Sequence, residues 1–552
     1  MSEFESSQPG RRAGRISAWF DSRPYRWWLL AAVLLLPVLG TAVLQGAWPA
    51  SQGHHPTGFI QYDQPSYLAN AREHFDSGFH WTYGLPFDAD PATPRIYFQP
   101  QILFLGAVHQ LTGVPPGWLL AGFGLLAGLA MVRVAIALYR QVVGLASAGS
   151  WLGLPLFLWG GGLLMLAGLL VSGGQPGRDM LAFDPGNGMW FLNLGRNLLY
   201  PLEAWYHLLA LGSVLLLWRR RWWPALAVLA LLAASHPMTG IQFLLLAGAW
   251  AVSERFLFRE RAPELTWIAT LGALTVLHLG YYLWFLNRFE SHRLLHEQWE
   301  LPWLLEPASA ALAYGLVGGL VLWRCLDRRQ PRPFATPGDR LLWAWFLVSL
   351  ALAKHEWVMD PIQPLHFTRG YVWTPLFLLG APVLIQWLDR LLAPGRAGSK
   401  RLLAVGLAGL LLFDNALWFA WFNASRLVKQ GRPGVNALTT EEAELFDALN
   451  DPRFRDRLLV SDNTKVAYLA NTFTPLRTWY GHIFNTPDAL TRRGEVRAYF
   501  ASGTTPEAWE GRALLVVIDR ESPPEWIEAG AFESVNERFH LILAPAGPIL
   551  PP

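Results

Sequence analysis

The sequence is poor in cysteine and in charged residues. Among 552 residues there is one cysteine, Cys325, and charged side chains make up 15%. A single cysteine excludes a disulfide framework and any metal site built from several cysteines. Soluble domains average roughly 25% charged residues, so a chain of this length lacks the charged surface that two or more soluble domains need. The low charge therefore argues against a soluble enzyme.

Apolar residues take the place of the missing charge. Hydrophobic residues make up 52% of the chain and aromatic residues 14%, which excludes a disordered or fibrous protein. Apolar stretches of about 20 residues recur, long enough to span a bilayer. The 29 tryptophans suit a protein with many membrane–water boundaries. The net charge is +3 and the arginines are scattered between apolar stretches, which argues against nucleic acid as a partner.

These features predict a polytopic α-helical membrane protein with about eleven transmembrane helices and a C-terminal soluble α/β domain. The expected spans lie at about 27–47, 116–139, 149–173, 200–218, 222–236, 239–254, 265–287, 307–323, 341–354, 372–388 and 401–422. With the N-terminus in the cytoplasm, the inside segments hold 21 Lys and Arg residues and the outside segments hold 8, as the positive-inside rule requires. Because eleven is odd, the C-terminal end is predicted on the outer face.

The chain is predicted to consist of three parts. They are a cytoplasmic tail at 1–26, a transmembrane domain at 27–422 with a large first outer loop at 48–115, and an extracytoplasmic domain at 423–552. The first span follows the polar tail without a small-residue cleavage site, so we expect a retained helix and no cleaved signal peptide. In the last part, strands are expected at 458–460 and 514–518, and helices at 440–450 and 486–500.

The first outer loop contains an acidic residue at the start of a predicted helix. Pro65 suits the first turn of a helix, and Asp63 suits the N-cap before it. Asp63, Tyr67, Asn70 and His74 share one face of that helix, because they are spaced by four, three and four residues. Two interpretations of Asp63 stay open: a helix cap, or a general base at the membrane surface.

Farther along this loop, the Tyr-Phe-Gln-Pro sequence at 97–100 leads into an apolar segment that ends near Leu111. This segment is too short to span and is predicted to lie along the membrane interface. The order of acid, tyrosine and aromatic-proline element resembles the GT-C superfamily of integral-membrane glycosyltransferases. The stretch 366–371 before a late span is similar to these enzymes too, and 479–482 with Arg492 and Arg493 resembles the outer domain of bacterial members. A second acid or a His-Pro-Pro, usual in the family, is missing, which leaves the subfamily open.

The resemblance implies a hexosyl- or pentosyltransferase of the bacterial inner membrane. Its donor would be a polyprenyl-phosphate-linked sugar, and its acceptor a lipid, a glycan or a protein. The family places a catalytic acid at Asp63, which would remove the proton of the attacking acceptor in an inverting reaction. The departing phosphate carries negative charge, so Arg, Lys, His or a metal ion must lie beside it. A divalent cation is therefore an open alternative as a cofactor.

The second outer loop, at 174–199, offers further candidates. It contains Arg178, Asp179, Asp184 and Arg196. Two carboxylates with arginines can complete a catalytic site or bind a divalent cation. A salt bridge within the loop is an equal alternative. We therefore take Asp179 and Asp184 as further candidates for the catalytic acid, and Arg178 and Arg196 as candidates for substrate binding.

Histidines and an arginine at the outer ends of later spans complete the predicted site. His236 joins two short apolar segments and is expected to bind phosphate or acceptor, with a turn as the alternative. His366 and Arg369 precede a late span, and Arg369 is the best phosphate candidate, with interface anchoring as the alternative. The residues predicted to bind substrate are Tyr67, Arg178, Arg196, His236, His366 and Arg369.

Two other functions compete with a transferase. A transporter or flippase of lipid-linked saccharides would place ionisable residues near the bilayer midplane in broken helices. Most ionisable residues here lie at outer ends, although the short spans at 222–236 and 239–254 fit transport. A polymerase or ligase of surface polysaccharide usually has its large loop late in the chain, whereas here the large loop comes first.

Overall fold

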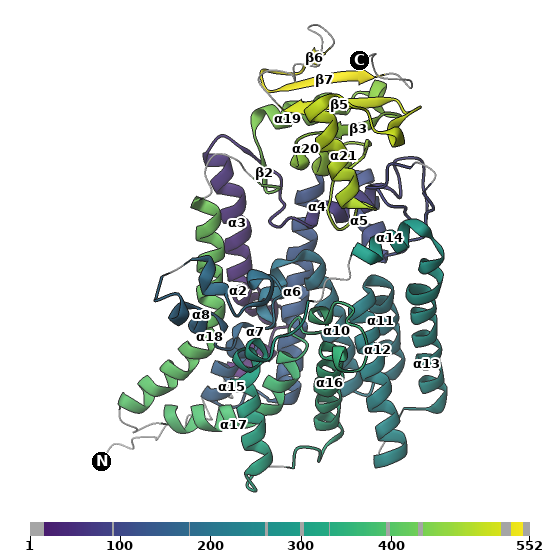
Figure 1. Ribbon diagram of the computed structural model, residues 1–552. Helices are drawn as coiled ribbons and strands as arrows, with labels where there is room; N and C mark the ends of the chain where they lie inside the picture. Colours follow the sequence, from purple (N-terminus) through teal and green to yellow (C-terminus); the bar gives the residue numbers. More distant parts are fainter. Residues whose placement is uncertain are drawn as a thin grey trace, which may run out of the picture. The chain divides into compact units, whose positions relative to one another are not determined.

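The protein is described by a computed structural model in which most elements are α-helices (Figure 1). The structure describes residues 16–90, 93–175, 177–259, 263–298, 303–330, 332–393, 398–428, 434–519 and 532–544. Residues 1–15 of the predicted tail, and 520–531 and 545–552 of the predicted outer domain, lie outside the described residues.

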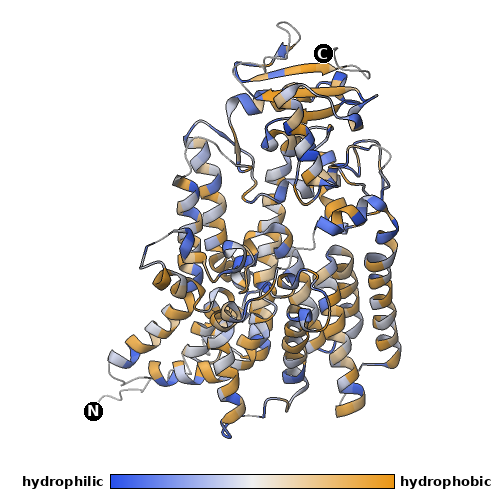
Figure 2. Ribbon diagram, viewed as in Figure 1, coloured by the Kyte–Doolittle hydropathy of each residue, from blue (hydrophilic) through white to orange (hydrophobic). Residues whose placement is uncertain are grey.

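Seven helical segments in the described ranges are long and apolar enough to cross a membrane. They are built on α6 (Pro116–Val142), α10 (Pro201–Trp218), α12 (Pro237–Val252), α13 (Leu265–Leu279), α15 (Pro307–Leu326), α17 (Trp373–Leu392) and α18 (Gly398–Val428). In Figure 2, orange residues line these helices along most of their length. The chain is therefore a multi-pass membrane protein.

Two bent helix pairs raise the number of spans to nine if each pair crosses once. One pair is α2 (Tyr25–Leu34) with α3 (Leu36–Ser51), bent by 58°, and the other is α7 (Ala148–Trp159) with α8 (Leu164–Val171), bent by 64°. Pro37 follows the first break, and a proline lacks the N–H that would continue the helix. Three glycines at 160–162 form the second break. At Gly162 a Cβ would lie 2.1 Å from the carbonyl oxygen of Leu312, so only glycine fits there.

The remaining two predicted spans are short helices. They are α11 (Trp222–Ser235), with 14 residues, and α16 (Pro337–Ala353), with 17 residues. At 1.5 Å per residue they extend roughly 21 and 26 Å, less than the roughly 30 Å of a hydrocarbon core. All eleven predicted segments are thus helical, but the described helices that are long enough to span number seven to nine.

The chain divides into two compact units. The first consists of Met1–Thr41, Gly124–Leu279 and Leu301–Ser425, and the second of Ala42–Phe123, Gly280–Glu300 and Arg426–Pro552. The second unit therefore combines the whole first outer loop, 48–115, with the C-terminal part of the chain. The domain boundaries expected from composition stay predictions.

The first unit has its core around α17. This helix packs against α7, α15 and α16, and its Phe377 ring lies 5.6 Å from that of Phe157 on α7. A buried ion pair also joins two of the helical segments in this unit. Arg340 of α16 donates to both carboxylate oxygens of Glu254, which follows α12, at 2.5 and 2.9 Å. Removing one partner of such a buried pair leaves an uncompensated charge, which typically costs about 3–5 kcal/mol.

The second unit contains a five-stranded mixed sheet in the order β4-β3-β5-β7-β6. Its strands are β3 (Leu458–Ser461), β4 (Arg477–Thr478), β5 (Leu514–Asp519), β6 (Glu533–Ser534) and β7 (Phe539–Ala544). β3 is parallel to β4 and β5, whereas β7 is antiparallel to β5 and β6. The accompanying helices are α19 (Thr440–Leu449), α20 (Thr464–Phe473) and α21 (Ala489–Ser502). Both predicted strands are present, as are both predicted helices, the second starting three residues later than expected.

Residues of the first outer loop pack directly on this C-terminal part. The helix α4 (Gln64–Arg72) lies against α20 and against α5 (Pro100–Thr112), the apolar segment after the aromatic-proline element. At Gly106 of α5 a Cβ would lie 2.3 Å from the carbonyl oxygen of Ala71, so the two helices approach closely only because this residue is glycine. The strand β1 (His55–Pro56) pairs with β2 (Ala437–Leu438).

A buried histidine in this unit should make its stability depend on pH. Burial, with Arg95 nearby, lowers the pKa of His74 to about 4, and its Nδ1 lies 2.8 Å from the carbonyl oxygen of His80. Its unfolded pKa is about 6.5, so the stabilisation by the neutral ring is complete above that pH. It is lost as the pH falls toward the folded value, by about 2 kcal/mol at pH 5.

Thermal unfolding in detergent at pH 7 and pH 5 measures this effect. His74→Asn keeps a nitrogen donor near the position of Nδ1 but cannot be protonated in this range. The asparagine variant should therefore lose less stability than the natural protein between the two pH values. Equal losses in both proteins would contradict a role for His74.

Candidate active site

Asp63 lies directly before α4, but its side chain does not cap this helix. The residue has helical backbone angles (φ −78°, ψ −12°), and within the described residues its carboxylate makes no capping hydrogen bond. Gln61 instead donates from Nε2 to Oδ2 at 2.6 Å, and Nε2 of His482 lies 3.1 Å from Oδ1. The capping interpretation of Asp63 is therefore wrong. The side chain stays 42% exposed, so a substrate can reach it.

Aromatic rings surround this carboxylate–imidazole pair. Tyr62 stacks on His482 at 4.8 Å with an interplanar angle of 22°, and Tyr468 of α20 lies 4.9 Å from the same ring. The Tyr468 hydroxyl donates to the carbonyl oxygen of Tyr62 at 2.6 Å, and the backbone N–H of Ser66 donates to that hydroxyl. Burial raises the pKa of Tyr62 above its ordinary value, and so do Tyr480 and Asp63, so the phenol stays neutral. We call these four residues, Tyr62, Asp63, Tyr468 and His482, the Asp63 site.

The other residues predicted on this helix face differ in their surroundings. Tyr67 is half-buried on α4. It is one of the phenols near the buried Tyr83, whose pKa lies well above its ordinary value, mainly because of burial. His74 is fully buried beside the carbonyl oxygen of His80, which suits a structural role.

The two acids of the second outer loop differ in burial. Arg178 and Asp179, in the short helix η1 (Arg178–Leu181), are exposed. Asp184 is fully buried and forms an ion pair with Arg196 at 2.5 Å. Burial and the nearby Asp414 raise the pKa of Asp184, while Arg196 opposes them. For Asp184 the structure thus shows the salt bridge that the sequence left open as the alternative.

Arg196 sits at the centre of a buried polar network. It donates to Asp414 Oδ2 at 2.7 Å and to Asn415 Oδ1 at 2.6 Å, both on α18, in addition to Asp184. Asp414 also accepts from the backbone N–H of Met165 on α8. The arginine thus fastens the second outer loop to α18, and its side chain has no exposed surface.

Arg369 lies in a second group of ionisable and aromatic residues, in the first unit. Its guanidinium forms an ion pair with Glu203, in the first turn of α10, and lies 4.9 Å from the ring centre of Trp190. His207, one turn after Glu203, contacts the Arg369 carbonyl oxygen through Nε2 at 2.7 Å and stacks on Tyr371 at 4.5 Å. Arg369 keeps 17% of its side chain exposed.

The two predicted histidines belong to the same group. His366, in the short helix η7 (Pro364–Phe367), packs edge-on against Trp190 at 4.8 Å and lies 5.9 Å from the ring of His236. Burial, with Arg369 and His236 nearby, lowers the pKa of His366 well below its ordinary value, so this ring is neutral. Its buried Nδ1 has no hydrogen-bond partner within the described residues. We call Glu203, His207, His236, His366 and Arg369, with Trp190, the Arg369 cluster.

His236 has a structural role as well. Its Nδ1 accepts a hydrogen bond from the backbone N–H of Thr239 at 3.1 Å, so the side chain caps the start of α12. The turn that the sequence left open is therefore present, with His236 as its cap. The ring also packs against Tyr206 at 4.5 Å and faces His366, which keeps it in the Arg369 cluster.

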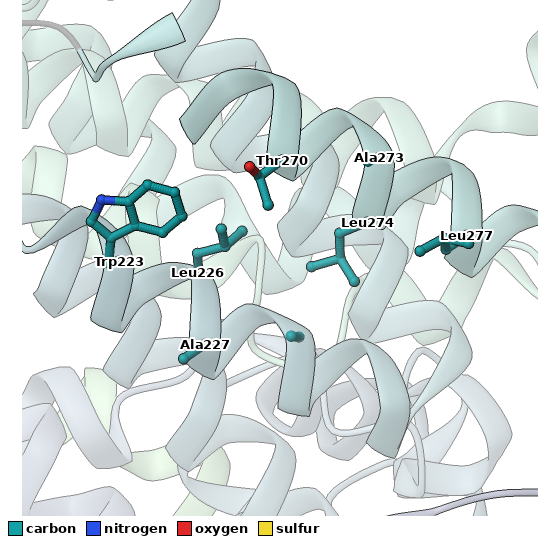
Figure 3. Close-up of a pocket in the computed structure, with 8 residues that line it drawn as sticks. Trp223, Leu226, Ala227, Thr270, Ala273, Leu274 and Leu277 are labelled. Carbon is teal, nitrogen blue, oxygen red and sulfur yellow. The ribbon is translucent and has the colours of Figure 1, made fainter. Parts of the chain in front are cut away.

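Two further features of the described residues concern ligand binding. Within the part of the chain that the structure describes, no three His, Cys, Asp or Glu residues gather closely enough to hold a metal ion. An open groove of about 400 Å³ runs between α11 and α13, and Figure 3 shows the apolar side chains of both helices along it. Its lining residues are Trp223, Leu226, Ala227, Ala230, Thr270, Ala273, Leu274 and Leu277.

Comparisons with known proteins give matches in structure only. No protein-family model and no curated protein matches the sequence. The chain is similar to the oligosaccharyltransferase of Archaeoglobus fulgidus in the apo form, with 11% identity and a TM-score of 0.48 over 91% of this chain and 70% of that chain. It is also similar to ArnT of Cupriavidus metallidurans bound to undecaprenyl phosphate, with 15% identity and a TM-score of 0.45 over 94% of this chain and 98% of that chain.

Both matched proteins are GT-C glycosyltransferases, the class that the first outer loop resembles. Because the TM-scores lie below 0.5, no residue role is taken from either protein.

Proposed function

We propose that this protein is a membrane glycosyltransferase that moves a sugar from a polyprenyl-phosphate-linked donor to an acceptor on the outer face of the membrane. The observation that carries the proposal is the Asp63 carboxylate, which is held by Gln61 and His482, does not cap its helix and stays accessible. The carboxylate removes the proton of an acceptor hydroxyl as the oxygen attacks the anomeric carbon. The bond from that carbon to the phosphate oxygen breaks, and the configuration inverts.

The Arg369 cluster, in the first unit, is proposed separately to bind a phosphate group of the donor. A guanidinium has five N–H donors, so Arg369 can hold Glu203 and still donate to a phosphate oxygen. The buried Nδ1 of His366 offers a second donor in the tautomer that carries the proton there. Tyr67 and Arg178 remain proposed contacts for substrate, and Asp179 remains a further candidate for the catalytic acid. Arg196 and Asp184 are proposed to act indirectly, because they hold the second outer loop in place.

A flippase is the second candidate, because two of the spans are broken. Transporters often carry broken helices beside ionisable residues. Here the break between α7 and α8 lies next to Asp414, where a Cβ at Gly161 would be 2.7 Å from Oδ2. Asp414 is already paired with Arg196, which favours a fixed structural network over a moving binding site.

Transfer with defined donors tests the proposal. The purified protein would be examined by mass spectrometry for bound lipid and then incubated in liposomes with polyprenyl-phosphate-linked hexoses and pentoses and with candidate acceptors. We expect release of polyprenyl phosphate together with a glycosylated product. Movement of the labelled donor across the bilayer without release of polyprenyl phosphate would instead identify a flippase.

The proposed orientation can be tested with the single cysteine. Cys325, at the end of α15, is exposed and belongs to a segment predicted in the cytoplasm, whereas Ser502 at the end of α21 is exposed and predicted outside. In intact cells a membrane-impermeant maleimide should label a Cys325→Ser/Ser502→Cys variant and should not label the natural protein. After permeabilisation both should react. Labelling of Cys325 in intact cells would reverse the proposed topology.

A further inference from the structure

We propose that His482 is a positioning residue of the same reaction, which fixes the proposed base Asp63 in its working orientation. The inference rests on the proposed function, because it takes Asp63 as the base. It starts from the contact between Nε2 of His482 and Oδ1 of Asp63 at 3.1 Å, made by residues 419 positions apart in the chain. Nothing in the sequence spacing predicts that contact.

The hydrogen bonds of His482 define which ring nitrogen carries the proton. The backbone N–H of Phe484 donates to Nδ1 at 3.2 Å, and the side-chain nitrogen of Asn485 lies 3.1 Å from the same atom. A ring nitrogen that accepts a hydrogen bond from a backbone N–H carries a lone pair and no proton. Nδ1 is therefore unprotonated, and the ring proton is on Nε2. Nε2–H then points at Asp63 and donates to its carboxylate. This assignment follows from the network of donors and acceptors around the ring.

With the ring proton on Nε2, His482 can hold the Asp63 carboxylate in place but cannot relay a proton from it. A relay needs a lone pair on the nitrogen that faces the carboxylate, or a second ring nitrogen that is free to release a proton. In His482 the first nitrogen carries the proton, and the second accepts from Phe484. The imidazole therefore donates one fixed hydrogen bond to Asp63.

The ring is itself held rigidly. His482 is 1% exposed and lies against Tyr62 and Tyr468. Its backbone is closed into a turn, because the Thr486 hydroxyl accepts from the N–H groups of Gly481 and His482 at 3.3 and 3.2 Å. The Thr486 N–H in turn donates to the carbonyl oxygen of His482 at 2.9 Å. A donor on such a fixed turn holds a partner in place without moving.

Asp63 is thereby held on both oxygens. Gln61 donates to Oδ2 at 2.6 Å, while His482 donates to Oδ1. The carboxylate is still 42% exposed, so lone pairs remain for an acceptor hydroxyl. A base fixed in this way is already oriented before the acceptor binds, and small errors in the position of a catalytic group slow a reaction strongly. The C-terminal part of the chain thus contributes to the proposed catalytic site.

Replacing His482 by alanine and by glutamine tests this role. His482→Ala removes the donor and should lower kcat by on the order of 10²-fold with little change in the KM of either substrate. The amide nitrogen of glutamine can reach the position of Nε2 and donate, so His482→Gln should recover most of kcat. Because glutamine does not titrate, its pH–rate profile should match that of the natural protein. Loss of one limb of the profile in His482→Gln would show that His482 is an acid–base group and would overturn the positioning role.

The variant His540→Ala is a control that distinguishes loss of the positioning role of His482 from general destabilisation of the fold. His540 on β7 is also a buried histidine of the same unit, and its Nδ1 contacts the hydroxyl of Ser534. His540→Ala should lower thermal stability without a selective loss of kcat. If His482→Ala does not fold, Asn485→Ala, which removes one contact to Nδ1, is the deciding variant and should lower kcat by the same measurement. Natural kcat in a folded His482→Ala, or in Asn485→Ala where His482→Ala does not fold, refutes the positioning role.

A double variant distinguishes failure of this inference from failure of the proposed function. If Asp63→Asn is inactive and His482→Ala keeps natural kcat, the positioning role alone is wrong. If Asp63→Asn stays active, Asp63 is not the base, so the base assignment and the positioning role both fail while the transferase function stands. If the natural protein transfers no sugar from any tested donor, the proposed function itself fails. If the base assignment and the positioning role both hold, Asp63→Asn/His482→Ala should be no slower than Asp63→Asn, because residues that act as one unit are not additive.

Discussion

Asp63→Asn should fold and insert normally yet transfer sugar on the order of 10²–10⁴-fold more slowly, as expected for loss of a general base. The substitution removes the basic oxygen and preserves the size of the side chain. It should cost little stability, because the natural carboxylate does not cap α4 and is 42% exposed. The measurement is transfer with a defined donor and acceptor, beside thermal unfolding of the same preparation.

Asp76→Asn is the matched control for this variant. Asp76 belongs to the same unit, is 32% exposed and pairs with Arg72 four residues earlier, so it loses the same charge at a site without a proposed role. It should keep normal transfer. If Asp63→Asn also keeps near-normal transfer, the base must be sought among the other acids. Asp179 then comes before Asp184, because it is exposed, whereas Asp184 is buried on Arg196.

The helices and strands were predictable because they depend on local composition. Apolar length predicted the segments that became α6, α10 and α18, and the helix expected at 440–450 became α19, whose start the structure shows as a capping box of Thr439 and Glu442. The expected spans at 222–236 and 341–354 were already short, as α11 and α16 are, but hydropathy could not show the bends in two other spans. Those features depend on single positions such as Gly162, whose neighbour across the bend is Leu312, 150 residues later in the chain.

Residues of the candidate site were predictable only where their neighbours in the sequence indicate a function. Asp63 was found because it follows a span and precedes a helix start. His482 was missed as a partner of Asp63, since only the fold brings the two together. Asp414 could have been found, because a carboxylate inside an apolar span rarely lies there without a partner. Its partner Arg196 was selected for substrate binding, but the structure places its side chain in a closed network.

Arg369→Ala should weaken donor binding, seen as a donor KM raised by roughly 10- to 100-fold. This is the range expected for losing a charge-assisted hydrogen bond of about 1.5–3 kcal/mol. Arg369→Lys keeps the charge but loses the planar fork of donors, so its donor KM should rise less. Steady-state transfer at varied donor concentration, with inorganic phosphate and polyprenyl phosphate as competitors, provides the measurement.

Loss of Arg369 also leaves its partner Glu203 unpaired, so Arg369→Ala changes two things at once. Glu203 is 6% exposed and would be left buried without its partner in Arg369→Ala, which typically costs about 3–5 kcal/mol. The variant Glu203→Gln/Arg369→Gln removes both charges and avoids this penalty. If Arg369 serves only to neutralise Glu203, this double variant should bind donor normally. If Arg369 also holds the phosphate, the double variant should fold and still show the raised donor KM. Arg340→Lys, at the more deeply buried pair with Glu254, should change thermal stability and leave the donor KM unchanged.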